Sequence, residues 1–274
     1  MSDRNVNVQT GSDAQVSGAQ APGIQIPGIQ AVGIQTPDAS FLDARLKAAA
    51  DLIRAERHAD IGSDHAALPI WLLQSGRADR VIVVEKTAGP LEVARRAVTQ
   101  AGLSGRAELR LGDGLEPLQA AELESVSLTG MGVRTMLGIL ERGRAAGRVS
   151  AALVAQPNDG AGLLRGWART HGYRLVAESM ASGFWRYPVL RLEWRGGPGV
   201  SSSDADHDPA YDGLPETAAL WYGPHLLRQA HPLLVQELQA QVARLEPLER
   251  HTRPQVLTDL HTVRSALAWL EHER

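Results

Sequence analysis

The fold of this chain is organised around the stretch Asp60-Ile61-Gly62-Ser63-Asp64-His65-Ala66-Ala67-Leu68-Pro69, which reads as the end of a buried strand, a tight turn and the start of a helix. Loops that cradle phosphate place several glycines where backbone N–H groups approach the anion. This turn has only Gly62, and Asp64 would repel a pyrophosphate. A carboxylate here suits a positively charged ligand, such as the amino group or sulfonium of S-adenosylmethionine (SAM). The alternative is an ordinary strand–helix turn in which Asp64 is the N-cap.

Length and composition indicate one large domain, or one domain with an appendage, because the chain has 274 residues of which 43% are hydrophobic. It contains no cysteine, which excludes a disulfide framework, a thiolate zinc site and a cysteine nucleophile. No stretch is apolar for long enough to span a membrane, and the N-terminus lacks a signal-peptide pattern. We therefore expect a soluble cytoplasmic protein, with a monomer slightly favoured.

Charge is distributed unevenly along the chain, whose formal net charge is −3. Residues 41–197 contain 21 Lys and Arg against 17 Asp and Glu, whereas residues 198–274 contain 6 against 11. The middle of the chain is therefore the part that can meet phosphates. This distribution permits an RNA partner but does not require one.

Short apolar runs alternate with helical patterns after a polar head, residues 1–40, which we predict to be a disordered tail. Ser40 is expected to open the first helix, with Asp43 completing a capping box. Five predicted parallel strands follow, and residues 173–180 and 184–194 read as an antiparallel pair. This order predicts a doubly wound, Rossmann-like α/β sheet. The five parallel strands are expected at residues 58–61, 81–84, 108–111, 126–128 and 152–155.

The C-terminal region reads as a helical extension, residues 210–274, joined by a linker at residues 198–209 to the sheet domain at residues 41–197. Two apolar helical faces flank Pro254, where one helix should end and the next begin. Such helices most simply pack as an antiparallel hairpin or short coiled coil. The two faces consist of Leu234, Leu238, Val242, Leu245 and Leu248, and of Leu260, Val263, Leu267 and Leu270.

Ligands bind at the carboxyl ends of the strands in open α/β sheets, so the residues that follow each predicted strand are the candidates for a site. Glu85 follows the second strand, 23 residues beyond Gly62, near the spacing at which an acidic residue binds ribose hydroxyls. Its alternative is a surface ion pair with Lys86. Gly112-Asp113-Gly114, after the third strand, can offer an acceptor to the adenine amino group, or can be a simple turn.

The last two parallel strands end in Thr129-Gly130-Met131-Gly132 and in Gln156-Pro157-Asn158. Glycines beside Met131 allow the backbone to approach a ligand, although helix–strand packing can also require them. The amide pair around Pro157 can read the edge of a base, or Asn158 can cap the next helix. Trp71 and Trp167 are expected in the core, and no cluster has metal-ligand spacing.

Together these motifs resemble the TrmK-like bacterial tRNA (adenine-22-N1) methyltransferases, which are class I SAM-dependent enzymes. The resemblance extends over residues 41–273, includes Leu42-x-x-Arg45-Leu46 at its start and Tyr222-Gly223-Pro224-x-Leu226-Leu227 near its end, and omits the head. The resemblance implies that the cofactor is SAM and that the partner is tRNA. It also implies that Asp64 and residues 156–158 face the target base. Two positions depart from the family pattern, Ala67 in place of Tyr and Val133 in place of Gly.

The candidate site combines the strand-end residues with those implied by the resemblance. The candidate catalytic residues are Asp64, Gln156, Pro157 and Asn158. The candidate cofactor-binding residues are Arg45, Asp60, Gly62, Asp64, His65, Glu85, Lys86, Asp113, Gly114, Gly130, Met131 and Gly132.

Adenine N1 has a free lone pair and can attack the sulfonium methyl group itself, so the enzyme mainly contributes alignment and electrostatics. A tRNA adenine-N1 methyltransferase is the leading interpretation. A SAM-dependent enzyme with another substrate and a non-catalytic SAM- or RNA-binding member of the family are the alternatives. A dinucleotide oxidoreductase is disfavoured because the glycine-rich phosphate turn is absent.

Overall fold

The computed structural model describes residues 42–63, 65–196, 207–251 and 253–272. All of these belong to one compact unit, Thr36–Arg274. The predicted disordered tail, residues 1–40, lies outside the described residues, and so does most of the predicted linker.

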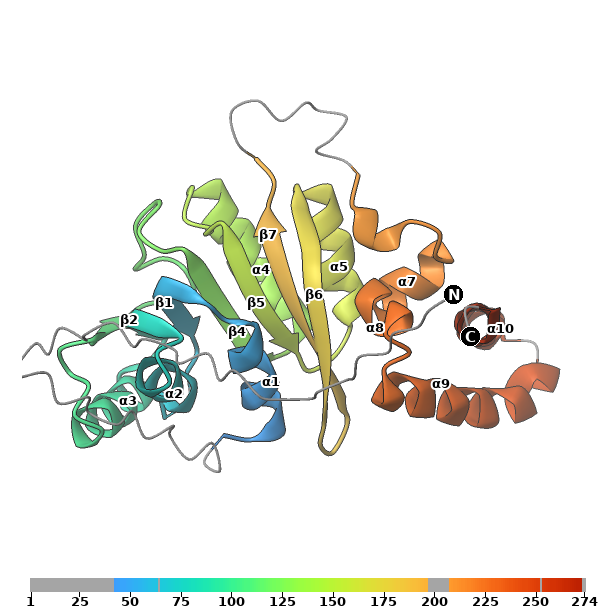
Figure 1. The fold of residues 1–274 in the computed structure, drawn as a ribbon, viewed down its shortest axis with the longest axis horizontal. Coiled ribbons are helices and arrows are strands. Elements are labelled where there is room, and N and C mark those ends of the chain that lie inside the picture. Colours follow the sequence, from blue (N-terminus) through green and yellow to red (C-terminus); the bar gives the residue numbers. More distant parts are fainter. Residues whose placement is uncertain (1–41, 64, 197–206, 252, 273–274) are drawn as a thin grey trace, which may run out of the picture. The chain divides into compact units, whose positions relative to one another are not determined.

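Seven strands form one mixed sheet in the order β3-β2-β1-β4-β5-β7-β6 (Figure 1). Strands β1 to β5 run parallel to one another, whereas β7 is antiparallel to both β5 and β6. The predicted α/β sheet and its antiparallel pair are confirmed, with β7 inserted between β5 and β6. The strands are β1 Ala55–Ile61, β2 Ala78–Glu85, β3 Ala107–Leu111, β4 Ser125–Met131, β5 Ala152–Pro157, β6 Tyr173–Ser182 and β7 Arg186–Trp194.

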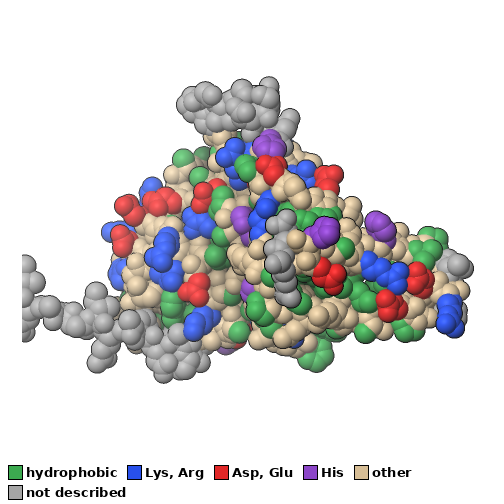
Figure 2. Space-filling model, turned by 45° about the vertical axis from the view of Figure 1, so that its right-hand side comes forward, with side chains coloured by type: hydrophobic (Ala, Val, Ile, Leu, Met, Phe, Trp, Pro, Cys, Tyr) green, Lys and Arg blue, Asp and Glu red, His purple; other side chains and the backbone are tan. Residues whose placement is uncertain are grey.

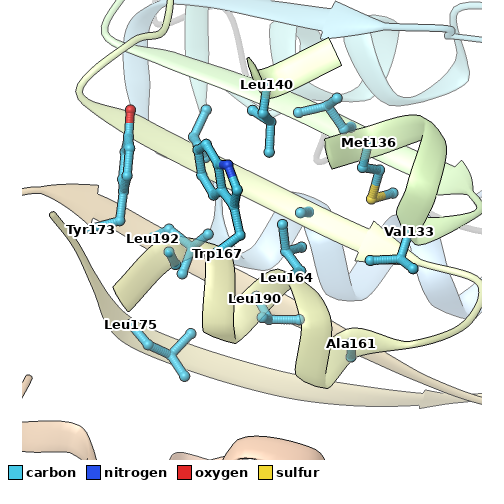
Figure 3. Close-up of a cluster of buried hydrophobic side chains, with 14 of the residues drawn as sticks. Val133, Met136, Leu140, Ala161, Leu164, Trp167, Tyr173, Leu175, Leu190 and Leu192 are labelled. Atoms are coloured by element: carbon cyan, nitrogen blue, oxygen red, sulfur yellow. The ribbon is translucent and has the colours of Figure 1, made fainter. Parts of the chain in front are cut away.

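Helices cover both faces of this sheet, and a strand such as β2 is therefore apolar on both sides. Val81 and Val83 of β2 belong to the core shared with α1, α2 and α3, whereas Ile82 and Val84 belong to the core shared with α4 and α5. Figure 3 shows the second core, where Trp167 lies among aliphatic side chains. Trp71 and Trp167 are buried as predicted. The helices are α1 Ala44–Leu52, α2 Ala67–Gln74, α3 Ala88–Gln100, α4 Val133–Ala145 and α5 Ala161–Thr170.

The first helix begins later than the sequence predicted. Asp43 is its N-cap, and the Asp43 carboxylate accepts a hydrogen bond from the Leu46 amide at 2.9 Å. Ser40 lies outside the described residues. Asp43 is therefore the cap itself and not the third residue of a capping box, because its side chain already satisfies a free amide of the first turn.

The C-terminal region contains the predicted helices and packs on the same core as α4 and α5. Figure 1 shows α9 running across the view while α10 is seen end-on, so the two helices cross and do not lie antiparallel. Leu248 is 42% exposed because a 3-10 helix replaces the last predicted turn of α9. The elements are η2 Pro209–Tyr211, α7 Glu216–Tyr222, α8 Pro224–Arg228, α9 Pro232–Leu245, η3 Glu246–His251 and α10 Pro254–His272.

A buried ion pair attaches this region to the sheet. Arg165 of α5 and Glu178 of β6 are both buried and lie 2.7 Å apart. Arg165 also donates to the carbonyl oxygens of residues 220 and 221, and Glu178 accepts from the amide of His225. Gly223 lies between these contacts with φ +98°, and a Cβ there would come within 2.6 Å of the Glu178 carboxylate. We call the Arg165–Glu178 pair, with its hydrogen bonds to residues 220, 221 and 225, the clamp. The lack of space beside Glu178 explains why glycine precedes Pro224.

Each helix in the part of the chain that the structure describes is too short or too polar to span a lipid bilayer.

Candidate functional site

The turn after β1 requires glycine at position 62. Gly62 has φ +71°, and its amide donates to the carbonyl of Val84 on β2 at 2.9 Å. A Cβ at this position would lie 2.7 Å from the terminal methyl of Met131, the last residue of β4. The two predicted turns therefore lie against each other at the carboxyl edge of the sheet.

The turn continues through two further residues in the left-handed region, His65 at φ 63° and Ala66 at φ 56°. Ala66 occupies the N-cap position of α2, so the alternative in which Asp64 is the N-cap is wrong. Such conformations are costly for residues with a Cβ and concentrate at functional sites. His65 is exposed, and Asp64 lies outside the described residues.

Beneath this turn lies a buried polar network that parallel register brings together. His58 and Asp60 of β1 are paired in register with Ser125 and Ser127 of β4. The ring nitrogens of His58 are 2.6 Å and 2.9 Å from the two serine hydroxyls, and Ser127 donates to Asp60 at 2.5 Å. Burial raises the pKa of Asp60 to about 6 and lowers the pKa of His58 to about 3. This buried network thus links β1 to β4 just before the Gly62 turn.

The second strand ends in Glu85, whose side chain is only 6% exposed. Its neighbour Lys86 pairs with Asp113 at 3.0 Å, and Arg142 of α4 approaches the same carboxylate at 3.4 Å. Glu85 is thus buried, whereas the pair of Lys86 and Asp113 is exposed. The ends of β2 and β3 therefore hold one buried and one partly exposed carboxylate.

Close packing also explains the glycine after Asp113. Gly114 has φ +61°, and a Cβ there would meet Ile139 of α4 at 2.8 Å. Gly114 therefore serves helix–strand packing at the third strand end.

The fourth and fifth strand ends are joined by their own amides. The Gly130 amide donates to Gln156 Oε1 at 3.1 Å, and Asn158 Nδ2 donates to the Gly130 carbonyl at 2.7 Å. The Asn158 amide donates to Met131 at 2.8 Å. Gln156 and Pro157 are buried, whereas Asn158 is exposed. Both side chains therefore hold the end of β4, but Gln156 does so from within the protein and Asn158 from its surface.

The next residue, Asp159, was missed by sequence reasoning. Its carboxylate accepts from the Val133 amide at 2.7 Å and so caps α4 across the turn. The αL residue before α5 is Gly160, so Asn158 does not cap that helix. A Cβ on Gly160 would lie 2.8 Å from a methyl of Val133, which shows that the valine fills space against this loop. Only its position beside Asn158 could have indicated Asp159.

Arg45 stands apart from the other candidates. Its guanidinium pairs with Asp43 at 2.6 Å and lies over the ring of Tyr187 on β7, 5.1 Å from the ring centroid. Arg45 thus contacts the start of α1 and strand β7 in the part of the chain that the structure describes. The structure brings together the ends of β1, β2, β4 and β5, with Arg45 on the β7 side.

Among the described residues, no group of three or more His, Cys, Asp or Glu side chains is placed to hold a metal ion. What the carboxyl edge offers is carboxylates, amides and glycine turns. Such groups accept hydrogen bonds from hydroxyl and amino groups, and they suit a ligand rich in donors.

Comparisons with known proteins point in the same direction. The family described as tRNA (adenine(22)-N(1))-methyltransferase, TrmK, matches residues 58–271. The tRNA (adenine(22)-N(1))-methyltransferase of Bacillus subtilis (strain 168) is 33% identical over 204 residues, which are 72% of this chain and 82% of that protein.

Solved structures are similar over most of the chain. The crystal structure of the B. subtilis M1A22 tRNA methyltransferase TrmK has a TM-score of 0.69 and 29% identity, over 84% of this chain and 97% of that chain. The Streptococcus pneumoniae protein Sp1610, a putative tRNA (m1A22) methyltransferase in complex with S-adenosyl-L-methionine, has a TM-score of 0.68 and 28% identity, over 82% and 99%.

Proposed function

The chain belongs to the tRNA (adenine(22)-N(1))-methyltransferase family, TrmK, and we propose that the carboxyl edge of β1, β2, β4 and β5 is its active site. It is a SAM-dependent methyltransferase that modifies N1 of adenine 22 in tRNA. The observation that carries the site assignment is the packing of the Gly62 turn against Met131 at the end of β4, with the buried Glu85 at the end of the neighbouring strand β2. Because tRNA is the substrate, we place the enzyme in the cytoplasm.

The residues at this edge fit SAM. Its ribose hydroxyls and ammonium group are donors, and Glu85 and Asp113 supply acceptors at adjacent strand ends. Gly62 leaves room where any larger residue would strike Met131. We assign Glu85 to the ribose hydroxyls, Asp113 to the adenine amino group, and residues 130–132 to the wall beside the reacting groups.

Adenine N1 has a free lone pair at neutral pH, and SAM when bound supplies an electrophilic methyl group, so the reaction needs no general base. Positive charge appears on the adenine ring as N1 gains its substituent. We assign the Asp64 carboxylate, next to the Gly62 turn in the sequence, to stabilising that charge. Its assignment rests on the sequence, since Asp64 lies outside the described residues.

The two side-chain amides at the end of β5, those of Gln156 and Asn158, are assigned different roles. Gln156 is buried and accepts a hydrogen bond from the Gly130 amide, so it is a positioning residue that holds the end of β4. Asn158 is exposed at the same loop and is assigned to contact the target base. In tRNA the N1 edge is often paired, so the base must be turned out into the site, at a cost of a few kcal/mol.

The test is mass spectrometry of nucleosides from a tRNA transcript incubated with protein and SAM. We expect 1-methyladenosine with adenine at position 22 and none when guanine replaces it. Asn158→Ala should lower the methylation rate by roughly 10-fold, the scale of losing part of base positioning, with SAM affinity unchanged. Gln74→Ala, an exposed amide at the far end of α2, is the matched control. Methylation at another nucleotide would contradict the assignment of the substrate.

A further inference from the structure

Two aromatic side chains project from the tip of the β6–β7 hairpin. Phe184 is 88% exposed and Trp185 is 64% exposed, and their rings meet edge-to-face with centroids 5.0 Å apart. In Figure 1 the hairpin extends past the lower ends of β4 and β5 beside α9, and Figure 2 shows hydrophobic side chains projecting from the lower edge. Exposed aromatic surface of this kind marks a contact site.

This hairpin forms one wall of a groove of about 460 Å³ that begins at the proposed active site. Asn158 is among the residues that line the groove. Trp185 and Arg186 line the hairpin side, and Tyr222 and Arg244 line the side formed by the C-terminal helices. The groove is therefore continuous with the loop assigned to the target base.

Each acidic side chain of the groove accepts a hydrogen bond from another group of the protein. Asp159 accepts from the Val133 amide, Glu237 accepts from Gln241 at 2.9 Å, and Asp259 accepts from Gln255 at 2.8 Å. Each of these carboxylates is therefore held in place by a neighbouring group of the protein.

Two arginines of the groove, Arg186 and Arg244, are not paired with a carboxylate among the described residues. Arg186 donates to the neutral amide of Gln236 at 3.3 Å, and neither Arg186 nor Arg244 forms an ion pair within the part of the chain that the structure describes. A ring surface with arginines beside it is the combination that binds a single-stranded nucleotide, by stacking its base and neutralising its phosphate.

We propose that the groove binds a nucleotide that flanks the target adenosine in single-stranded RNA, with its base stacked on Trp185 and its phosphate between Arg186 and Arg244. The proposal rests on the proposed function, since the flanking nucleotide belongs to the tRNA that delivers the adenine. The stack holds the strand open next to the displaced base, and Phe184 supports the Trp185 ring from its edge.

The first test is a binding measurement that does not depend on turnover. A 12-nucleotide single-stranded RNA is titrated into the protein while tryptophan fluorescence is recorded, with the same sequence as a duplex for comparison. We expect the single strand to quench the wild type. Because both variants lack this reporter, their affinities are measured from the anisotropy of the same RNA carrying a fluorescent label. We expect about tenfold weaker binding in Trp185→Ala and little loss of affinity in Trp185→Phe, which keeps a stacking ring. Equal affinity of Trp185→Ala and wild type would overturn the proposal.

The second test is kinetic. Trp185→Ala should raise KM for tRNA about tenfold, with unchanged SAM affinity and an unchanged thermal midpoint, because the side chain is exposed. Trp194→Ala, at the opposite end of β7 and 46% exposed, is the matched control. If light scattering shows that Trp185→Ala changes the oligomeric state without changing RNA affinity, the tip is an interface between copies and the proposal is wrong. Failure of the proposed function would appear differently, as no methylation of tRNA by the wild type while the single strand still quenches Trp185.

Discussion

The buried network of His58, Ser127 and Asp60 predicts two opposite pH dependences of stability that cancel in the wild type. The pKa of Asp60 is raised to about 6 in the folded protein, so its contribution is fully present below its unfolded value of 3.8 and is lost as the pH rises through 6. The pKa of His58 is lowered to about 3, so the unfolded chain binds the extra proton and stability is lost as the pH falls below 6.5.

The magnitudes follow from the two shifts, since one pKa unit corresponds to about 1.4 kcal/mol. Between pH 4 and pH 7 Asp60 should lower the free energy of unfolding by roughly 3 kcal/mol as the pH rises. Over the same interval His58 should raise it by roughly 3 kcal/mol. The wild type should therefore show little net slope from this pair.

The assay is urea unfolding of wild type, Asp60→Asn and His58→Asn at several pH values between 4 and 7. Subtracting each variant from the wild type removes the contribution of all other titrating groups. The difference curve for Asp60→Asn should fall with rising pH, and the curve for His58→Asn should rise. Two curves of the same sign, or two flat ones, would refute the account of burial given for this network.

Three further predictions concern the site and the clamp. Glu85→Gln should weaken SAM binding by about 1–3 kcal/mol, measured by calorimetry, and unchanged affinity would remove Glu85 from the site. Asp64→Ala should lower the methylation rate roughly 100-fold, and Asp64→Asn should recover little of it. The exposed Asp79→Ala is the control. Near-normal turnover of Asp64→Ala would contradict an electrostatic role. Gly223→Ala should destabilise the fold by at least about 1 kcal/mol, because its φ is left-handed and its Cβ would strike Glu178; Gly213→Ala, with φ +70° and open space, isolates the steric part in thermal melts.

The sheet was predictable because strands such as β2 and β5 are buried on both faces and read as apolar runs. The carboxyl-end rule then indicated the edge where Gly62, Glu85 and Asn158 lie. The insertion of β7 between β5 and β6 was not predictable, since apolar alternation sets which face is buried and not which strand is the neighbour.

Features that depend on distant partners escaped sequence reasoning. Arg165 reads as a surface residue on an amphipathic helix until Glu178 and the carbonyls of residues 220 and 221 enclose it. Gln156 reads as a base-contacting amide until its partner Gly130 is known to occupy it. Local pattern predicts an element, but the partner of a side chain depends on the completed fold.

The clamp has a consequence for how the chain folds as it leaves the ribosome. Arg165 and Glu178 emerge well before residues 220–225, which supply the remaining hydrogen bonds of the pair. Until then a paired arginine and glutamate would have to be buried with donors and acceptors unmet, which is costly. Folding of β6 against α5 should therefore wait for α7 and α8 to be synthesised, so that the sheet closes late and the nascent chain presents an open edge at β5 in the interval.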